Sequence, residues 1–241
     1  MLTYSESCFK GKVIAVTGAS RGIGRETSLL LSQLGASLIV GSRSKQELDT
    51  LGKQLKGPML SLQLDVTEES SVERFVEAGT AHFGSIDAVV HCAGLGTFAP
   101  LLETSTEDFD RMIAVNLRGS FLVNRTFGKH MADKGSGKIV NLISIAGKAA
   151  LPGCGGYSAS KYGLLGLSRV LQAELRGKGV EIISVLPGAT VTPFWDGMES
   201  TPDLTGMIPV ESLARHIVYL LTQQKGAYID EITIMPVLGI L

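Results

Sequence analysis

The sequence predicts an α/β fold in which one doubly wound, parallel, seven-stranded sheet is flanked by helices on both faces. Short runs rich in Val, Ile and Leu alternate with longer amphipathic stretches along the chain. Aromatic residues are only 6% of the 241 residues, so aliphatic side chains must supply most of the core. No Pro-rich, Ser-rich or charged linker divides the chain, so we expect a single domain over 1–241.

The expected strands are the short apolar runs, at residues 13–17, 37–42, 59–64, 87–91, 138–143, 180–186 and 231–235. The expected helices are the amphipathic stretches, at residues 22–34, 44–55, 67–82, 106–134, 157–177 and 210–223. Because β-α-β crossovers are right-handed, the strands should run parallel. The segment 189–209 breaks the rhythm, and we expect it to form a lid over a substrate bound beyond the carboxyl ends of the strands.

Charge and cysteine content argue against several classes of protein. A formal net charge of −1 does not suit a nucleic-acid-binding surface. Cys8, Cys92 and Cys154 have no metal-type spacing and fit no complete disulfide framework, so we expect no metal site and free thiols in a reducing cytoplasm. No secretory signal and no membrane-spanning run is visible, so no membrane partner is expected.

A glycine-rich turn joins the first expected strand to the first expected helix. Its sequence is Thr17-Gly18-Ala19-Ser20-Arg21-Gly22-Ile23-Gly24. Glycines let the backbone turn sharply and approach a pyrophosphate, while N–H groups at the helix start face the anion. The spacing differs from the general dinucleotide fingerprint, but its place between strand and helix favours a cofactor site on a Rossmann-type sheet over a plain tight turn.

Two arginines predict which cofactor binds. Sites that prefer NAD usually hold the ribose 2′-hydroxyl with an acid after the second strand. Here Arg43 stands at that place, and Arg21 lies inside the glycine turn. Because guanidinium groups make charge-assisted contacts with phosphate, the pair favours the 2′-phosphate of NADP(H). The alternative is two solvent-exposed arginines without a ligand.

An acid–base pair begins the helix after the fifth strand, in Tyr157-Ser158-Ala159-Ser160-Lys161. Positions i and i+4 share a helix face, so the Tyr157 hydroxyl and the Lys161 ammonium can approach one ligand. A nearby ammonium and an oxidised nicotinamide would favour the phenolate, which lets Tyr157 exchange a proton with substrate. Ser144, just after the fifth strand, could hydrogen-bond a substrate carbonyl across the same cleft.

These motifs resemble the short-chain dehydrogenase/reductase family, in its NADP-dependent branch, from about residue 10 to about residue 192. The resemblance implies a catalytic set of Asn116, Ser144, Tyr157 and Lys161. It also implies that Asn116 interrupts the helix 106–134 and holds a water that links Lys161 to solvent.

The resemblance extends the cofactor contacts. It implies that Asp65 binds the adenine amino group and Val66 packs on the ring, although Asp65 could instead cap the next helix. It implies that the Pro187-Gly188 segment and Thr192 bind the nicotinamide carboxamide, although Thr192 could instead cap a turn. The full predicted cofactor set is Gly18, Ser20, Arg21, Gly22, Ile23, Gly24, Arg43, Asp65, Val66, Ala93, Gly94, Tyr157, Lys161, Pro187, Gly188 and Thr192.

One motif departs from the family pattern. Where the family usually reads Asn-Asn-Ala-Gly, this chain has His91-Cys92-Ala93-Gly94. Ala93 and Gly94 still permit close approach to the adenosine ribose. We expect His91 to replace one hydrogen bond of the missing asparagines and Cys92 to behave as a small buried hydrophobe.

The predicted function is NADP(H)-dependent oxidoreduction, with hydride transfer between nicotinamide and a carbonyl or secondary alcohol and Tyr157 as acid and base. The lid contributes Phe194, Trp195, Met198, Met207 and Ile208, which predicts a partly apolar substrate pocket. One alternative is a 3-oxoacyl thioester (acyl-carrier-protein) reductase, for which Arg125, Lys129, Arg169 and Arg176 are either a docking surface or a solvated helix face. Another is a non-catalytic NADP(H)-binding redox sensor, against which the intact Ser144, Tyr157 and Lys161 argue.

The resemblance also implies a homotetramer or homodimer, formed through the helices after the fourth and fifth strands. Apolar residues available for such an interface are Phe121, Leu122, Leu164, Leu167 and Leu171, although burial in the core explains some of them equally well.

Overall fold

The computed structural model describes residues 8–196, 203–223 and 226–240. Within that part of the chain, seven parallel strands form one sheet in the order β3-β2-β1-β4-β5-β6-β7, which confirms the predicted fold class. The strands are β1 (Val13–Thr17), β2 (Ser37–Ser42), β3 (Met59–Gln63), β4 (Ala88–His91), β5 (Gly137–Leu142), β6 (Val180–Pro187) and β7 (Glu231–Ile234).

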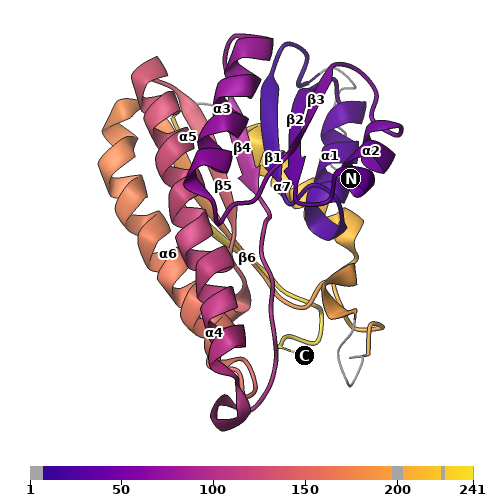
Figure 1. Cartoon of the computed structure of the whole chain (residues 1–241), viewed down its shortest axis with the longest axis vertical. Helices are drawn as coiled ribbons and strands as arrows, with labels where there is room; N and C mark the ends of the chain where they lie inside the picture. The colour runs from indigo at the N-terminus through magenta and orange to yellow at the C-terminus, as the bar shows by residue number, and fades with distance from the viewer. Residues whose placement is uncertain (1–7, 197–202, 224–225, 241) are drawn as a thin grey trace.

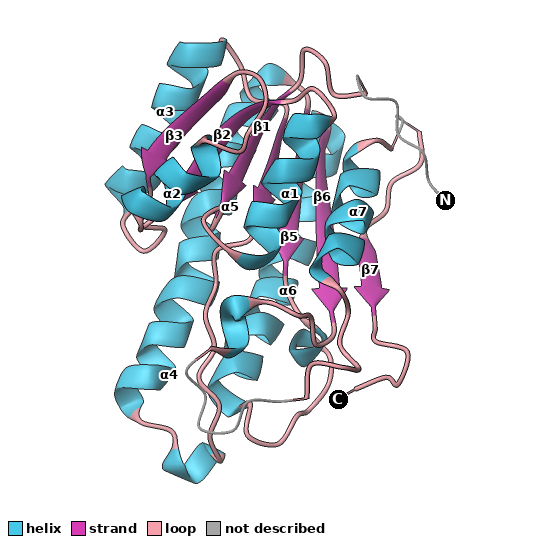
Figure 2. Ribbon diagram, turned by 90° about the vertical axis from the view of Figure 1, so that its right-hand side faces the viewer, coloured by secondary structure: helices cyan, strands magenta, loops and turns pink. Residues whose placement is uncertain are grey.

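Helices cover both faces of the sheet (Figures 1 and 2). One face carries α1 (Gly22–Gln33), α2 (Lys45–Gly52) and α7 (Val210–Leu221). The other carries α3 (Glu69–Phe83), α5 (Ser120–Lys134) and α6 (Gly155–Leu175). None of the described helices is long and apolar enough to cross a membrane.

Alternation along the strands divides the core into two layers. In β1, Ile14 and Val16 pack toward α1, α2 and α7. Their neighbours Val13 and Ala15 pack toward α3, α5 and α6. Because successive side chains of a strand point to opposite faces, a run of apolar residues is needed where both faces are covered. The sheet is therefore held between two apolar layers.

The long helix expected over 106–134 is three segments. It consists of α4 (Thr106–Met112), a π-helical segment η2 (Ile113–Gly119) and α5. A π segment widens the helix locally and is often found at functional sites. The prediction of one continuous α-helix over 106–134 is therefore wrong, because Asn116 lies in the π-helical segment η2. The interruption of the helix at Asn116, which the family resemblance implies, is present.

Short 3-10 turns supply the remaining described helical structure. They are η1 (Leu101–Glu103), η3 (Ile145–Gly147), η4 (Arg176–Lys178) and η5 (Pro193–Trp195). Two of them, η3 after β5 and η5 after β6, lie at the carboxyl end of the sheet. The predicted lid over 189–209 includes η5, and its residues 197–202 lie outside the described residues.

Candidate active site

A cavity of about 540 Å³ opens at the carboxyl ends of the strands. In the strand order, the chain direction of the crossovers reverses between β1 and β4, and this is where ligands bind in open α/β sheets. Every predicted cofactor-binding residue lines this cavity, as do Ser144, Tyr157 and Lys161. Asn116 does not line it and lies behind the wall, against Gly94 and Ser160.

The glycine turn after β1 leaves no room for side chains. A Cβ on Gly18 would lie 2.7 Å from the Ala93 nitrogen, and a Cβ on Gly24 would lie 2.3 Å from the Gly18 oxygen. Gly22 has a φ of +54°, which only glycine adopts without strain. The turn thus fits closely against the loop after β4 and presents the N-terminus of α1 to the cavity. This cradle fits the pyrophosphate of a dinucleotide.

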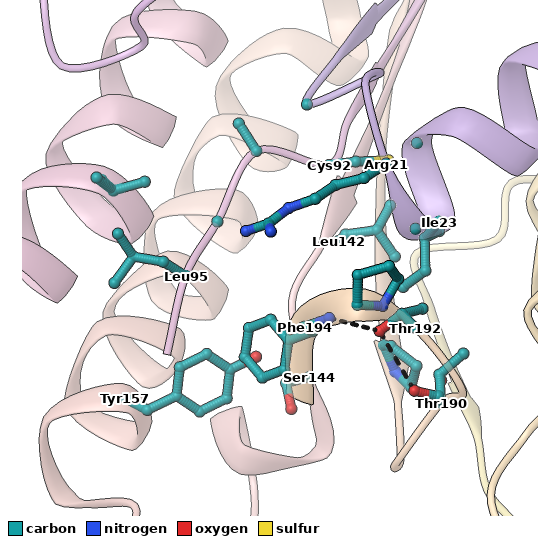
Figure 3. A pocket seen from close by; sticks show the side chains of 18 of the residues that line it. Arg21, Ile23, Cys92, Leu95, Leu142, Ser144, Tyr157, Thr190, Thr192 and Phe194 are labelled. Atoms are coloured by element: carbon teal, nitrogen blue, oxygen red, sulfur yellow. Dashed lines mark hydrogen bonds between the residues drawn. The ribbon is translucent and has the colours of Figure 1, made fainter. Parts of the chain in front are cut away.

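Two arginines line the same end of the cavity. Arg21 extends its side chain into the pocket (Figure 3). Arg43 follows β2 and is exposed. Neither guanidinium forms an ion pair with a carboxylate among the described residues, so both are available to an anionic ligand. Two acids, Glu47 in the first turn of α2 and Asp65 after β3, also line this end.

Asp65 forms a turn rather than a helix cap. Its Oδ1 accepts hydrogen bonds from the Thr67 nitrogen at 2.9 Å and the Thr67 hydroxyl at 2.7 Å. The helix α3 begins later, and its N-cap residue is Glu68. The alternative that Asp65 caps this helix is therefore wrong, because its carboxylate accepts hydrogen bonds within its own loop. That loop holds Asp65 and Val66 at the cavity wall.

The predicted acid–base residues converge from the segment after β5 and from α6. The hydroxyls of Tyr157 and Ser144 point toward the same part of the pocket in Figure 3. Ser144 accepts a hydrogen bond from the Ala146 nitrogen at 3.1 Å, which fixes its position before η3. Lys161 is buried, its Nζ donates to the Leu142 oxygen at 3.0 Å, and it lies 5.6 Å from the Tyr157 ring centre. The i, i+4 spacing therefore brings the two groups to one cleft, as expected.

Burial shifts the proton affinities of this pair. It raises the pKa of the Tyr157 hydroxyl to about 12, while a hydrogen bond with Ser144 acts in the opposite direction. It lowers the pKa of the Lys161 ammonium to about 8, and the electrostatic effect of Cys92 acts in the opposite direction. Desolvation penalises the charged form of each group. Without a ligand, the phenol form of Tyr157 is favoured, and a cation bound beside it would be needed to favour the phenolate.

Asn116 ties the π segment to the wall of the cavity. Its Oδ1 accepts from the Leu95 nitrogen at 2.9 Å, and its Nδ2 donates to the Leu95 oxygen at 2.7 Å and to the Ser160 hydroxyl at 3.0 Å. Ser160 donates in turn to the Tyr157 carbonyl at 2.7 Å. Asn116 is thereby connected to the turn of α6 that carries Tyr157.

His91 makes two hydrogen bonds, one more than the sequence suggests. Its Nδ1 lies 2.7 Å from the Thr17 hydroxyl and its Nε2 lies 2.8 Å from the Ser120 hydroxyl. Ser120 donates its proton to the Asn116 carbonyl at 2.6 Å, so it must accept from Nε2–H, and Nδ1 must accept from Thr17. Burial lowers the pKa of the His91 imidazole to about 3, which keeps this neutral tautomer. These hydrogen bonds connect Thr17 in β1, through His91 in β4 and Ser120 in α5, to the Asn116 carbonyl in η2.

The remaining residues predicted for the site are Cys92 and the residues of the loop after β6. Cys92 is half-buried and lines the cavity, and burial raises the pKa of its thiol to about 12, which makes it a poor redox sensor. Thr192 accepts a hydrogen bond from the Phe194 nitrogen at 3.4 Å, so it caps the turn, and it also lines the cavity, where its contact with a nicotinamide stays a prediction. Met207 and Ile208, expected in the lid, are buried outside the cavity lining, and Met198 lies outside the described residues.

Several lining residues carried no motif in the sequence. They come from the loop after β4, from η3 and from the loop before α6, and they are Leu95, Phe98, Ile145, Leu151 and Cys154. Phe98 was detectable only as an aromatic residue soon after Gly94. Apolar loop residues resemble core residues in a sequence, so their common position could not be read from it.

The sheet, the glycine cradle and the acid–base cleft together define an oxidoreductase of the kind that uses a nicotinamide cofactor. Residues 12–203 match the family model described as short chain dehydrogenase. The chain belongs to the short-chain dehydrogenase/reductase family, and the predicted family is confirmed.

Its relatives act on different substrates. A 3-oxoacyl-(acyl-carrier-protein) reductase of Thermotoga maritima is 34% identical over 228 residues, covering 90% of this chain and 93% of the relative. A D-threitol dehydrogenase of Mycolicibacterium smegmatis is 37% identical over 194 residues, covering 78% and 75%. The structure of an alcohol dehydrogenase from Thermococcus sibiricus, complexed with 5-hydroxy-NADP, aligns with a TM-score of 0.85 at 31% identity and covers 94% of this chain and 97% of that one.

Proposed function

We propose that the protein is an NADP(H)-dependent reductase of carbonyl compounds, or a dehydrogenase of the corresponding secondary alcohols. The observation that carries this proposal is the convergence of Ser144, Tyr157 and Lys161 on the cavity that the glycine turn opens into. A surface helix pair would not need a buried Lys161, whose ammonium loses hydration there. The glycine turn alone would serve any dinucleotide-binding protein.

The proposed mechanism assigns a separate task to each residue. A bound reduced nicotinamide would supply the hydride that reduces the carbonyl carbon. Tyr157 would donate the proton of its hydroxyl to the carbonyl oxygen, and Ser144 would hold that oxygen by a hydrogen bond. Lys161, held by the Leu142 oxygen, would hydrogen-bond the cofactor ribose and favour the phenolate after proton transfer. Asn116 would keep this face of α6 in place through Ser160.

The preference for NADP(H) over NAD(H) rests on Arg21 and Arg43. Both line the cavity and both lack an ion-pair partner among the described residues, so a 2′-phosphate would find two free guanidinium groups. The complex of the Thermococcus sibiricus relative with 5-hydroxy-NADP supports the same choice.

The test follows the absorbance of NADPH while the purified protein is given a panel of small ketones. We expect turnover with the wild type, and a kcat lower by about 10²- to 10⁴-fold in Tyr157→Phe, because general acid catalysis is lost. The matched control is Tyr162→Phe, which removes the same hydroxyl from an exposed position of α6. Retained turnover in Tyr157→Phe would refute the role of this residue.

A 3-oxoacyl thioester reductase is the second candidate, favoured by the Thermotoga maritima relative. A docking surface for an acidic carrier protein would need unpaired cations. Three of the four expected ones are paired, Arg125 with Glu69, Arg169 with Glu231 and Arg176 with Asp230. Turnover of a 3-oxobutanoyl thioester in preference to every ketone would favour this candidate. Tight NADPH binding without turnover of any carbonyl compound would favour the redox-sensor alternative.

We also propose a homodimer or homotetramer that uses the outer surfaces of α5 and α6. Phe121, Tyr162 and Val170 are exposed there, 41%, 47% and 59% respectively. Of the residues expected at this interface, Leu122 and Leu164 are buried in the core and cannot contribute. A cytoplasmic location is proposed from the free thiols of Cys8, Cys92 and Cys154.

A further inference from the structure

Four aromatic rings surround the proposed reaction centre. They come from three separate segments, namely Phe98 after β4, Tyr157 in α6, and Phe194 with Trp195 in η5. Ring centres lie 5.5 Å apart for Phe98 and Tyr157 and 5.8 Å apart for Tyr157 and Phe194. Phe98 also stacks on Trp195 at 5.9 Å with an interplanar angle of 23°. These distances are in the range of favourable aromatic contacts, so the rings form one wall beside the Tyr157 hydroxyl.

Gly96 and the backbone at Thr190 hold these rings in position. A Cβ on Gly96 would lie 2.7 Å from Phe194 Cζ and 2.9 Å from Phe98 Cζ, so only glycine leaves room for both rings. The Trp195 indole donates its N–H to the Thr190 oxygen at 2.8 Å. Its polar atom is thereby satisfied by the backbone, and one face of its ring is stacked against Phe98, so the indole contributes apolar surface to the wall.

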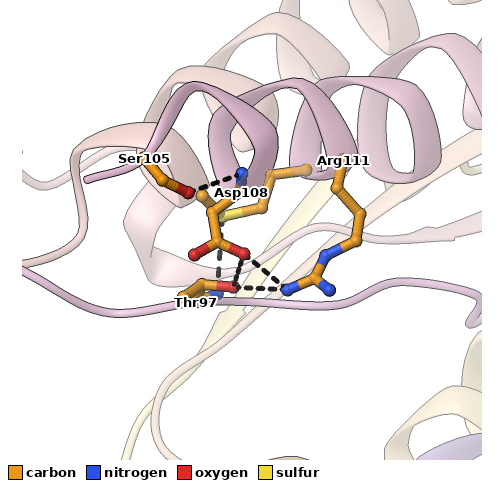
Figure 4. A network of polar contacts seen from close by, with 5 residues as sticks. Thr97, Ser105, Asp108 and Arg111 are labelled. Atoms are coloured by element: carbon orange, nitrogen blue, oxygen red, sulfur yellow. Dashed lines mark hydrogen bonds and ion pairs between the residues drawn. The ribbon is translucent and has the colours of Figure 1, made fainter.

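The charged groups nearest this end of the cavity are bound by other groups of the protein. The acidic and basic lining residues Arg21, Arg43, Glu47 and Asp65 come from the segments after β1, β2 and β3, which form the cofactor end. Lys161 is held by the Leu142 oxygen. Arg111, on the helix beside Phe98's loop, is paired with Asp108 at 2.6 Å and also contacts Thr97 (Figure 4). Lys148 is paired with Glu231 at 2.7 Å. The Lys161 ammonium, 5.6 Å from the Tyr157 ring centre, is the exception, because it has no carboxylate partner among the described residues. In the proposed function the Leu142 oxygen and the cofactor ribose occupy this ammonium, which leaves it unavailable to an anionic substrate.

We propose that the substrate is an uncharged carbonyl compound that carries a planar or cyclic group next to the carbonyl. This inference rests on the proposed function and specifies its substrate class. The carbonyl oxygen would lie at Ser144 and Tyr157, and the ring would pack against Phe98, Phe194 and Trp195. A flexible acyl chain gains less from such a wall, because it loses rotational freedom on binding and presents no ring face.

The first experiment compares substrates of equal carbon number with NADPH. The pair is 1-phenyl-1,2-propanedione and 2,3-nonanedione, and phenylglyoxylate is the anionic analogue of the first. We expect kcat/KM to be at least about tenfold higher for the phenyl diketone than for the linear one, equal to about 1.4 kcal/mol. We expect no measurable turnover of phenylglyoxylate. A higher kcat/KM for the linear diketone or for the anion would overturn the inference while leaving the proposed function intact.

The second experiment measures binding without turnover. Trp195 is the single tryptophan of the chain, so its fluorescence reports on the wall directly. Each diketone is titrated into protein saturated with NADP⁺, which cannot reduce it. We expect saturable quenching with a Kd at least about tenfold lower for the phenyl diketone. Equal dissociation constants, or no saturable quenching by either compound, would contradict the inference.

Variants that keep Trp195 then locate the effect. Phe98→Leu and Gly96→Ala each alter the wall, and each should reduce the preference for the phenyl diketone by at least about threefold. The control Tyr228→Leu removes an exposed aromatic ring that packs against Arg176, outside the cavity, and should leave the preference unchanged. Both wall variants are first confirmed as folded by circular dichroism. An unchanged preference in both would mean that the phenyl ring of the substrate binds away from this wall, which would contradict the inference. Selective binding of the phenyl diketone without turnover would support the wall and refute the reductase.

Discussion

At the scale of single residues, His91 is a buried polar group whose charge state affects stability. Its imidazole is 1% exposed, and burial, with the Lys161 ammonium as a smaller cause, lowers its pKa to about 3. Between pH 6.5 and about 3, the unfolded chain therefore binds a proton that the folded chain excludes. Stability is full above pH 6.5 and is lost as the pH falls, by up to about 1.4 kcal/mol per pH unit from this residue.

The prediction is tested with the free energy of unfolding in urea at pH 7.5, 5.5 and 4.5. We expect the loss of stability on acidification to be smaller in His91→Asn than in the wild type, because Asn has no charge to exclude. His91→Asn should also be less stable at pH 7.5 by about 1–3 kcal/mol, because a polar partner is left unsatisfied. His216→Gln, which changes an exposed histidine, is the control, and its free energy of unfolding should depend on pH as that of the wild type does. Parallel pH profiles for wild type and His91→Asn would contradict the prediction.

Arg43 determines the cofactor in the proposed function. Hydrogen bonds to charged groups contribute about 1.5–3 kcal/mol, so Arg43→Ala should lower kcat/KM for NADPH by about 10- to 150-fold. The value for NADH should change little, because NADH has no 2′-phosphate for this side chain to contact. Arg74→Ala, on the exposed side of α3 and outside the cavity, is the matched control. An equal decrease in kcat/KM with NADPH and with NADH would mean that Arg43 stabilises the fold rather than binding the 2′-phosphate.

At the scale of elements, the turn between β1 and α1 depends on the absence of a single Cβ. An added methyl group on Gly24 would lie 2.3 Å from the Gly18 oxygen, and a backbone atom cannot yield as a side chain can. Gly24→Ala should therefore weaken NADPH binding at least about tenfold and cost roughly 1–3 kcal/mol of stability, as overpacking does. NADPH fluorescence titration and urea unfolding measure the two effects. Gly177→Ala, where a Cβ meets open space, should change neither.

Elements differ in how well the sequence predicts them. The strands and the covering helices follow from local periodicity, which is a property of neighbouring residues, and the glycine turn follows from the order strand, glycines, helix. The π segment at Asn116 could not be predicted from periodicity, because it depends on hydrogen bonds to Leu95 and Ser160 from distant parts of the chain. The aromatic wall has the same origin, since Phe98 and Trp195 are brought together only by the folded loops.

In the predicted lid, residues 189–209, the sequence did not separate the residues that line the cavity from those that pack in the core. Phe194 and Trp195 were predicted in the pocket and do line it, whereas Met207 and Ile208 do not. Ile208 instead hydrogen-bonds the backbone of Ala189 and Val191 on the other side of the loop, and its side chain joins the core layer beneath α7. An apolar residue near a site can serve the site or the core, and only the path of the loop decides which.

At the scale of the whole molecule, the proposed assembly rests on the exposed apolar residues of α5 and α6. Phe121, Tyr162 and Val170 lie on two long helices that pack against each other, on the side away from the sheet. Exposed apolar groups gathered on one face commonly mark an interface. The Arg125 guanidinium lies 5.1 Å from the Phe121 ring centre, so a cation is also present at this surface.

We therefore expect light scattering to give twice or four times the 25.5 kDa mass of one chain. Val170→Glu should shift the protein toward the mass of a monomer, because a buried charge without a partner costs several kcal/mol at an interface. Gln46→Glu adds the same charge on α2, across the sheet from the proposed interface, and should leave the mass unchanged. A wild-type mass of one chain would refute the assembly. If Val170→Glu is monomeric and still turns over ketones, the subunit interface serves stability rather than catalysis.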